Sequence, residues 1–167
     1  MKIKKLTIAA MLAAVAVVGS LISVPVLGAK CAPVQHIVNV VCAIVLGPFY
    51  GVSVAFVASL IRNLLGLGTL LAFPGSMCGA LLAGLLYYFF KKTPFAYIGE
   101  VVGTAIIGGM LAYPVALLFM GNKAAALFTF VVPFAISTVV GTIIFKIPCS
   151  IRLLKYFNSL KLFATFL

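Results

Sequence analysis

Long apolar runs, separated by short breaks that hold glycine, proline or lysine, make up most of the chain. Most of these runs approach the ~20 residues that an α-helix needs to cross the hydrocarbon layer of a bilayer, although the second is shorter. The pattern therefore predicts an all-α membrane protein, a bundle of six transmembrane helices with both termini in the cytoplasm. The predicted helices are Leu6–Leu27, Val34–Leu46, Phe49–Leu65, Gly75–Phe90, Ala96–Phe119 and Ala124–Phe145.

The number of helices depends on two places in the sequence. Gly47-Pro48 separates the second and third runs and either breaks the chain into two helices or only kinks one, so a five-helix bundle is the alternative. The first run follows a lysine-rich start, as in a secretory signal, but it is about 22 residues long and has no clear cleavage site before Pro25. Lys30 also occupies a position where a lipoprotein signal needs a small residue. We therefore expect the first run to remain as a helix.

Composition indicates lipid rather than water as the main solvent, because 65% of the residues are hydrophobic and only 8% are charged. The net charge of +11 does not indicate nucleic-acid binding, since the basic residues sit at the ends of apolar runs. Six crossings satisfy the positive-inside rule, whereas an odd number would move a basic cluster outside. The cytoplasmic side then holds Lys2, Lys4, Lys5, Lys91, Lys92, Lys146, Arg152, Lys155 and Lys161, and the outer side holds Lys30, Arg62 and Lys123.

The chain has almost none of the residues that catalysis requires. Glu100 is the only acidic residue and His36 the only histidine, so paired carboxylates, Ser/His/Asp triads and carboxylate-bound metals cannot form. There is no phosphate loop of the ATPase type, and the four cysteines include no CxxC pair. We predict neither enzyme activity nor a cofactor, and energy for uphill transport has to come from a partner or a gradient. Cys42, Cys78 and Cys149 are expected to be apolar fillers, and Cys31 to lie in an outer loop.

Polar residues within apolar runs are costly in lipid, so they mark a pathway or a packing contact. Gln35, His36 and Asn39 lie within about one turn at the outer end of the second helix. They either line a pocket there or cap the helix against water and headgroups. Arg62 and Asn63 end the third helix, before a glycine-rich loop that can close over a ligand. Arg62 either contacts that ligand or extends to lipid headgroups.

Glu100 is predicted about one turn inside the fifth helix from its cytoplasmic end. Two interpretations follow. Glu100 either forms an ion pair with Lys91 or Lys92, or it faces inward, in a substrate pocket or in gating linked to protonation. The second interpretation leads to an alternative function, an autonomous proton-coupled carrier of small molecules that uses Glu100. A purely structural subunit, which would bind no ligand, is a third option.

Small residues recur at four-residue spacing, a pattern that lets helices approach closely in lipid. On the fourth and fifth helices, Gly75, Gly79 and Ala83 together with Gly99 and Gly103 predict packing inside the bundle. On the first helix the stripe serves either internal packing or the docking of another membrane subunit. The members of this stripe are Ala9, Ala10, Ala13 and Ala14.

Three blocks of sequence resemble the ThiW-type substrate-binding (S) component of energy-coupling-factor (ECF) vitamin transporters. They are KKLTIAAMLAA, the block from GAKCAPVQHIVN to FPGSMCGALLAG, and GEVVGTAIIGGMLAYPVA. The resemblance covers residues 1–147 as a six-helix S-component domain, followed by a basic and aromatic cytoplasmic or interfacial tail, 148–167. It implies a multi-pass protein of the cell membrane that captures a thiamine precursor, the hydroxyethylthiazole moiety, and passes it inward by toppling. The implied partners are a transmembrane coupling subunit and two ATPase subunits.

The resemblance also implies where the substrate binds, because S components hold it in the outer half of the bundle, under the first and third loops. A small neutral thiazole needs an aromatic wall and a few hydrogen-bonding groups. An analogue without the hydroxyl is expected to bind about tenfold weaker, since a buried donor left unpaired costs about 1 to 3 kcal/mol. The alanine stripe of the first helix is the implied docking site for the coupling subunit. The expected substrate contacts are Gln35, His36, Asn39, Asn63 and Ser76, with Phe73 or Tyr113 against the ring and Glu100 as a further candidate.

Overall fold

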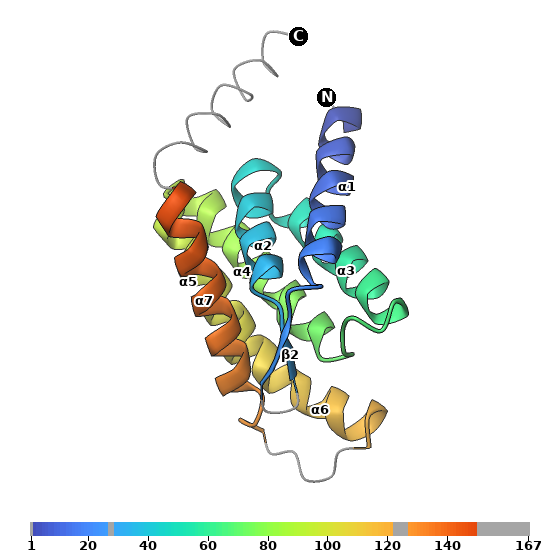
Figure 1. Cartoon of the computed structure of the whole chain (residues 1–167). Coiled ribbons are helices and arrows are strands. Elements are labelled where there is room, and N and C mark those ends of the chain that lie inside the picture. Colours follow the sequence, from blue (N-terminus) through green and yellow to red (C-terminus); the bar gives the residue numbers. More distant parts are fainter. Residues whose placement is uncertain (1, 27–28, 122–126, 150–167) are drawn as a thin grey trace, which may run out of the picture.

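Each predicted apolar run contains a helix in the computed structural model, which describes residues 2–26, 29–121 and 127–149 (Figure 1). A short antiparallel hairpin follows the first helix. Of the predicted tail, 148–167, the residues after Cys149 lie outside the described part of the chain. The helices are α1 (Lys2–Gly19), α2 (Pro33–Val45), α3 (Pro48–Leu64), α4 (Ala72–Phe90), α5 (Thr93–Val101), η1 (Val102–Gly108), α6 (Gly109–Phe119) and α7 (Val131–Cys149), and the strands are β1 (Val24–Val26) and β2 (Ala29–Cys31).

The described residues form six helical bodies, because α5, the π-helical η1 and α6 follow one another without a gap as one helix of 27 residues. Successive bodies run in opposite directions, so α7 ends at the end of the bundle where α1 begins (Figure 1). The alternative in which Gly47-Pro48 only kinks one helix is wrong, because α2 and α3 are separate helices. Gly47 has a φ of 90°, in the left-handed region that favours glycine, and Pro48 starts α3 in a new direction.

The first helix is shorter than predicted, since α1 ends at Gly19 and not at Leu27. The residues that follow include β-branched valines and Pro25, which suit a short strand better than a helix. They pair antiparallel as β1 and β2, with Val24 opposite Cys31. The last helix begins at Val131, later than predicted. Its predicted start, Ala124, lies outside the described residues.

Helix α4 occupies the middle of the bundle and packs against α2, α3, α5 and η1. Its contact with the long helix has no room for larger side chains. A Cβ added at Gly99 would lie 2.7 Å from Ala83 Cα, and one added at Gly103 would lie 2.6 Å from the carbonyl oxygen of Cys78. The small residues of the fourth and fifth predicted helices therefore pack inside the bundle, and that prediction is confirmed.

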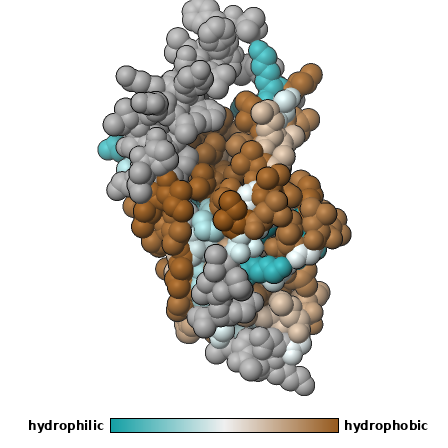
Figure 2. All heavy atoms as spheres, in the orientation of Figure 1, coloured by the Kyte–Doolittle hydropathy of each residue, from teal (hydrophilic) through white to brown (hydrophobic). Residues whose placement is uncertain are grey.

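The outside of the bundle is largely apolar. Figure 2 shows a mostly hydrophobic face with a narrow strip of more polar residues, and large side chains such as Leu118 and Ile143 are exposed on α6 and α7. By length and composition, α4 and the continuous Thr93–Phe119 qualify as membrane spans among the described residues, while α2, α3 and Val131–Ile144 are shorter apolar helices. Six crossings with cytoplasmic termini therefore stay a prediction.

Candidate functional site

The polar side chains of α2 point into the bundle. Gln35, His36 and Asn39 are all buried, and Asn39 has no exposed surface. Residues three and four positions apart lie on the same side of a helix, so Asn39 shares one side of α2 with the other two. Helices α4 and α7 pack against α2. The three residues therefore lie where they can meet groups from other helices.

Glu100 is completely buried in the long helix and reaches this side of α2. Its Oε1 lies 2.8 Å from His36 Nδ1 and accepts hydrogen bonds from Asn39 Nδ2 at 3.0 Å and Thr104 Oγ1 at 3.2 Å. A carboxylate can only accept hydrogen bonds, so an ionised Glu100 requires that Nδ1 of His36 carries a proton. Oε2 of Glu100 has no partner among the described residues.

An ion pair of Glu100 with Lys91 or Lys92, one of the two interpretations of the sequence, is wrong. Glu100 pairs with His36, while the Lys91 ammonium lies over an aromatic ring at the exposed end of α4, 4.4 Å from the ring centroid. The helix begins at Thr93, so Glu100 lies about 10 Å along its axis at 1.5 Å per residue, nearer two turns than one. At that depth the carboxylate faces the interior of the bundle.

Gly79 on α4 leaves the space that the Glu100 carboxylate occupies. A Cβ at this position would overlap Thr104 Oγ1 and lie 2.8 Å from Glu100 Oε2. The segment η1 begins two residues after Glu100 and carries Thr104, and π-helical turns within α-helices are frequent at functional sites. The carboxylate therefore reaches α2 past a position that has no side chain.

Hydroxyl groups from three other helices extend the network. His36 Nε2 lies 3.0 Å from Ser137 Oγ on α7. Asn39 Nδ2 also donates to the Ser76 carbonyl oxygen on α4 at 3.2 Å, and Ser76 Oγ lies 2.8 Å from Ser59 Oγ on α3. Burying a polar group is costly unless it is hydrogen-bonded. These bonds therefore hold the side chains in place. The network joins the long helix to α2, α3, α4 and α7.

Arg62 enters the bundle from the last turn of α3 and does not extend to the surface, since only 2% of it is exposed. Its Nη1 donates to Gln35 Oε1 over a long 3.4 Å, and its Nε has no partner among the described residues. Gln35 Nε2 donates in turn to Asn39 Oδ1 at 3.2 Å. The guanidinium is thus connected to the network through a neutral amide and not through the carboxylate.

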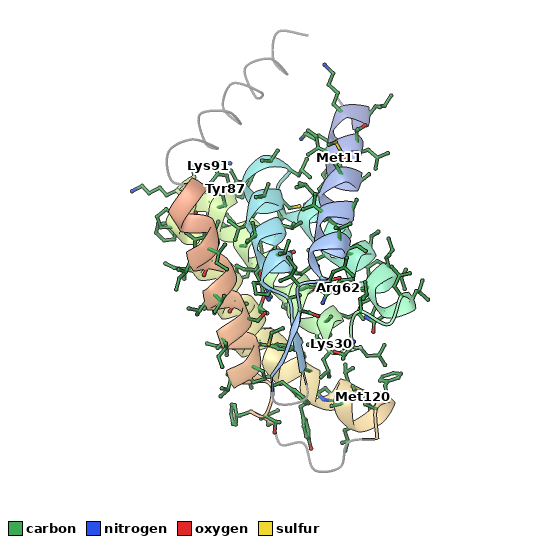
Figure 3. All side chains as sticks on the ribbon, viewed as in Figure 1. Met11, Lys30, Arg62, Tyr87, Lys91 and Met120 are labelled. Carbon is green, nitrogen blue, oxygen red and sulfur yellow. The ribbon has the colours of Figure 1, made fainter. Side chains whose placement is uncertain are left out.

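A cleft opens beside this network, in the half of the bundle that holds Lys30 and Arg62 and away from Lys91 (Figure 3). Phe134 supplies the aromatic surface of its wall. The free volume is about 30 Å³, which holds one or two water molecules. Lys30 Nζ donates to the Gly66 carbonyl oxygen at 2.8 Å, linking the hairpin to the loop after α3. The lining residues are Lys30, Cys31, Ala32, Gln35, His36, Arg62, Ala72, Gly75, Ser76, Thr104, Phe134 and Ser137.

Three of the expected substrate contacts line the cleft, namely Gln35, His36 and Ser76. Asn39 and Glu100 do not line it but hydrogen-bond to residues that do. They form a buried layer that positions the lining side chains. The structure therefore brings five of the expected residues together, in and directly behind the wall of the cleft.

Three other expected contacts, Asn63, Phe73 and Tyr113, are not among the lining residues. Asn63 Nδ2 donates to a carbonyl oxygen in α3 at 2.8 Å and to one in the following loop at 3.1 Å, so its role is to hold this loop. Phe73 packs against Phe56 with ring centroids 5.7 Å apart. The aromatic wall comes from Phe134 on α7 instead, a helix that packs against α2.

Several lining residues were not predicted from the sequence. Thr104 and Ser137 are polar residues inside apolar runs, which is the signal that should have selected them. Cys31, expected in an outer loop, lies in β2 and is buried, and its Sγ donates to the Pro133 carbonyl oxygen at 3.3 Å. Burial raises the pKa of this thiol, against a smaller opposing effect of its hydrogen bond with Ser137. Cys31 is therefore an uncharged thiol in the cleft wall at neutral pH.

The alanine stripe of α1 is divided between two faces. Ala9 and Ala13 are buried in a cluster with residues of α2 and α3, whereas Ala10 and Ala14 are exposed. Small residues allow close approach on both faces. Only the exposed pair is available to another subunit in this arrangement.

A protein-family model described as "Thiamine-precursor transporter protein (ThiW)" matches residues 6–154. The matched range includes every residue of the network and of the cleft. No curated protein and no solved structure matches the chain.

Proposed function

Because the chain belongs to the ThiW family of thiamine-precursor transporters, we propose that it is the substrate-capture (S) subunit of an ECF-type importer. In this proposal it binds the hydroxyethylthiazole moiety of thiamine from outside, as a multi-pass protein of the cell membrane. The observation that carries the proposal is the polar cleft beside His36 and Glu100, inside an otherwise apolar bundle. Intramembrane ionisable residues of this kind mark substrate pathways.

The distribution of lysines supports an outward-facing cleft. Lys4 and Lys5 begin α1, and Lys91 and Lys92 join α4 to α5 at the same end of the bundle (Figures 1 and 3). By the positive-inside rule this end is cytoplasmic. The cleft near Lys30 then faces the outer side, where a substrate arrives.

The chemistry of the cleft suits a small heteroaromatic ring with hydrogen-bonding groups. Phe134 offers a flat surface for stacking, and Gln35, His36, Ser76 and Ser137 offer donors and acceptors around it. A free volume of about 30 Å³ is too small for such a ring. Binding therefore requires the cleft to widen, and the hydrogen bond from Lys30 to the loop after α3 is the contact that opening would break.

In this proposal other subunits supply the energy for import, because the chain has no phosphate loop for ATP. We infer assembly with a transmembrane coupling subunit and two ATPase subunits. The exposed Ala10 and Ala14 on α1 are the proposed contact with the coupling subunit, since small residues let two helices approach closely. Delivery then proceeds by toppling of the whole subunit in the membrane.

Equilibrium binding tests the capture function. The purified chain in detergent is titrated with hydroxyethylthiazole, hydroxymethylpyrimidine, thiamine and riboflavin. We expect tight binding of the thiazole alone, and binding about tenfold weaker for its analogue without the hydroxyl. Failure to bind any of the four compounds would refute the capture of neutral hydroxyethylthiazole. Equal affinity for the deoxy analogue would refute only the hydroxyl contact.

A second candidate function, the autonomous proton-coupled carrier, has support from the buried His36–Glu100 pair. Two adjoining titratable groups away from water can hold and release a transferable proton. Proteoliposomes that contain only this chain separate the two functions. Uptake driven by a pH gradient and abolished by Glu100→Gln would favour the carrier, whereas uptake that appears only with the coupling subunit and ATPases favours the S component.

A further inference from the structure

Arg62 carries a buried charge that the rest of the chain does not neutralise. The sequence contains a single acidic residue, Glu100, and the ion pair that this carboxylate forms is with His36. The only hydrogen bond of the Arg62 side chain among the described residues is the long one to the Gln35 amide, and its Nε has none. A buried charge is costly unless it is paired and hydrogen-bonded. Arg62 therefore has no counter-charge among the described residues, which leaves its guanidinium open to pair with an added group.

The position of Arg62 at the end of α3 compensates for only part of this charge. Cations are favoured at a helix C-terminus, where the carbonyl groups act as about half a negative charge, and the stabilisation is typically below about 1 kcal/mol at exposed sites. The side chain instead turns into the bundle and lines the cleft. The Arg62 side chain thus lies beside a space that a ligand can occupy.

The surroundings of the cleft are also electropositive. Lys30 lines it from the hairpin. Ala32 and Ala72, which also line it, mark the N-terminal ends of α2 and α4, and neither end is capped by a side-chain hydrogen bond. Helix N-termini carry about half a positive charge and favour anions. No acidic residue lines the cleft, since Glu100 lies behind His36.

From this arrangement we propose that the cleft takes its substrate as an oxyanion, a thiamine precursor that bears a phosphate monoester or a carboxylate, with that group bound by Arg62. The planar guanidinium matches the geometry of two oxygen atoms of such a group. Lys30 and the ends of α2 and α4 add long-range attraction. This inference rests on the proposed capture function and refines it, because a neutral alcohol would leave Arg62 unpaired.

A lipid headgroup offers the same phosphate chemistry, and an experiment in two environments distinguishes the sources. The purified chain is titrated with hydroxyethylthiazole, its phosphate monoester and thiazole acetic acid, in lipid-free dodecyl maltoside and in phosphatidylcholine nanodiscs. In both, we expect at least one anionic compound to bind about 10- to 100-fold tighter than the alcohol, the range for an added hydrogen bond between charged groups. Inorganic phosphate is expected to compete with it.

Variants at two basic residues locate the effect. Arg62→Gln is expected to reduce the preference for the anion to less than about threefold while the alcohol still binds, which also shows that the variant folds. Lys91→Gln, a matched loss of charge at the other end of the bundle, should leave the preference unchanged. If Arg62→Gln does not fold, the affinity ratio of the wild-type chain and the competition by phosphate decide the question.

The outcomes separate this inference from the capture function. Binding of the alcohol as tight as or tighter than both anions overturns the oxyanion site and leaves the capture function standing. The preference for the anion could instead be present in detergent and absent in nanodiscs, with phospholipid retained by the wild-type chain and not by Arg62→Gln. That result assigns Arg62 to lipid binding and also overturns the oxyanion site. Binding of no thiazole at all overturns both.

Discussion

Gly79 on α4 leaves the space that Glu100 and Thr104 occupy, and substitution of this glycine tests whether the network is as tightly packed as described. A Cβ added here would overlap Thr104 Oγ1 and lie 2.8 and 2.9 Å from the two carboxylate oxygens of Glu100. Both side chains are buried on a helix whose backbone already touches α4. Neither can withdraw without moving that helix or breaking its hydrogen bonds.

The cost of Gly79→Ala has three parts. Overpacking of a well-packed interior costs about 1–3 kcal/mol. Displacing the Glu100 carboxylate weakens its hydrogen bonds to His36 and Asn39, and a bond to a charged group contributes about 1.5–3 kcal/mol. Alanine regains about 1 kcal/mol of helix propensity over glycine. We expect a net loss of about 1.5–5 kcal/mol in the free energy of unfolding, together with weaker thiazole binding.

The assay is thermal and denaturant unfolding of the purified chain in detergent, with Gly51→Ala as the matched control. Gly51 is also buried in a helix, but the nearest atoms to an added Cβ are 3.7 Å away, so this variant should be neutral or stabilised by up to about 1 kcal/mol. Thr104→Ala combined with Gly79→Ala should recover part of the loss. Equal stability of the two glycine variants, or no recovery in the double variant, would refute the described packing.

Three further predictions concern single residues of the site and its surroundings. Glu100→Ala removes the carboxylate that accepts from His36 and Asn39, and it should lower the free energy of unfolding by about 3–5 kcal/mol. Glu100→Gln keeps an acceptor oxygen and should lose less stability. Equal losses of the two variants in denaturant unfolding would contradict the network. Phe134→Leu should weaken thiazole binding about two- to tenfold by removing the ring contact, and Phe73→Leu should not, so equal effects in a titration would argue against the wall assignment. Asn63→Ala should cost about 1–2 kcal/mol of stability, because two hydrogen bonds are lost. The thiazole affinity of the folded variant should change less than about threefold. A larger change in affinity would show that Asn63 belongs to the binding site.

Local pattern was enough to predict most of the helices. The apolar runs and their breaks predicted six helical bodies, and the Gly47-Pro48 pair correctly indicated where α2 ends and α3 begins. The error at the end of α1 came from counting Val24 and Val26 as part of one apolar run. Hydropathy does not distinguish a helix from a short β-hairpin, whereas β-branched residues beside Pro25 favour the strand.

The site was only partly predictable, because it depends on which sides of distant helices meet. Gln35, His36 and Asn39 were selected as polar residues in an apolar run, and they do lie together. His36 contacts both Glu100 and Ser137, which are 64 and 101 residues away in the sequence. No local pattern predicts these contacts. For the same reason the aromatic wall was sought near Phe73 and is supplied by Phe134.

What the sequence by itself determined is the apolar character of the chain, most of its helices and the shortage of acidic residues. A chain with one acidic residue has a single carboxylate side chain available for ion pairs, whatever its fold. Only the tertiary structure decided that this pair goes to His36 and that Arg62 is buried without a counter-charge. The physical reason is that apolar runs specify helices through local patterns of sequence. The rotation of each helix follows instead from close packing at small residues such as Gly79, and this rotation decides which groups its polar residues meet.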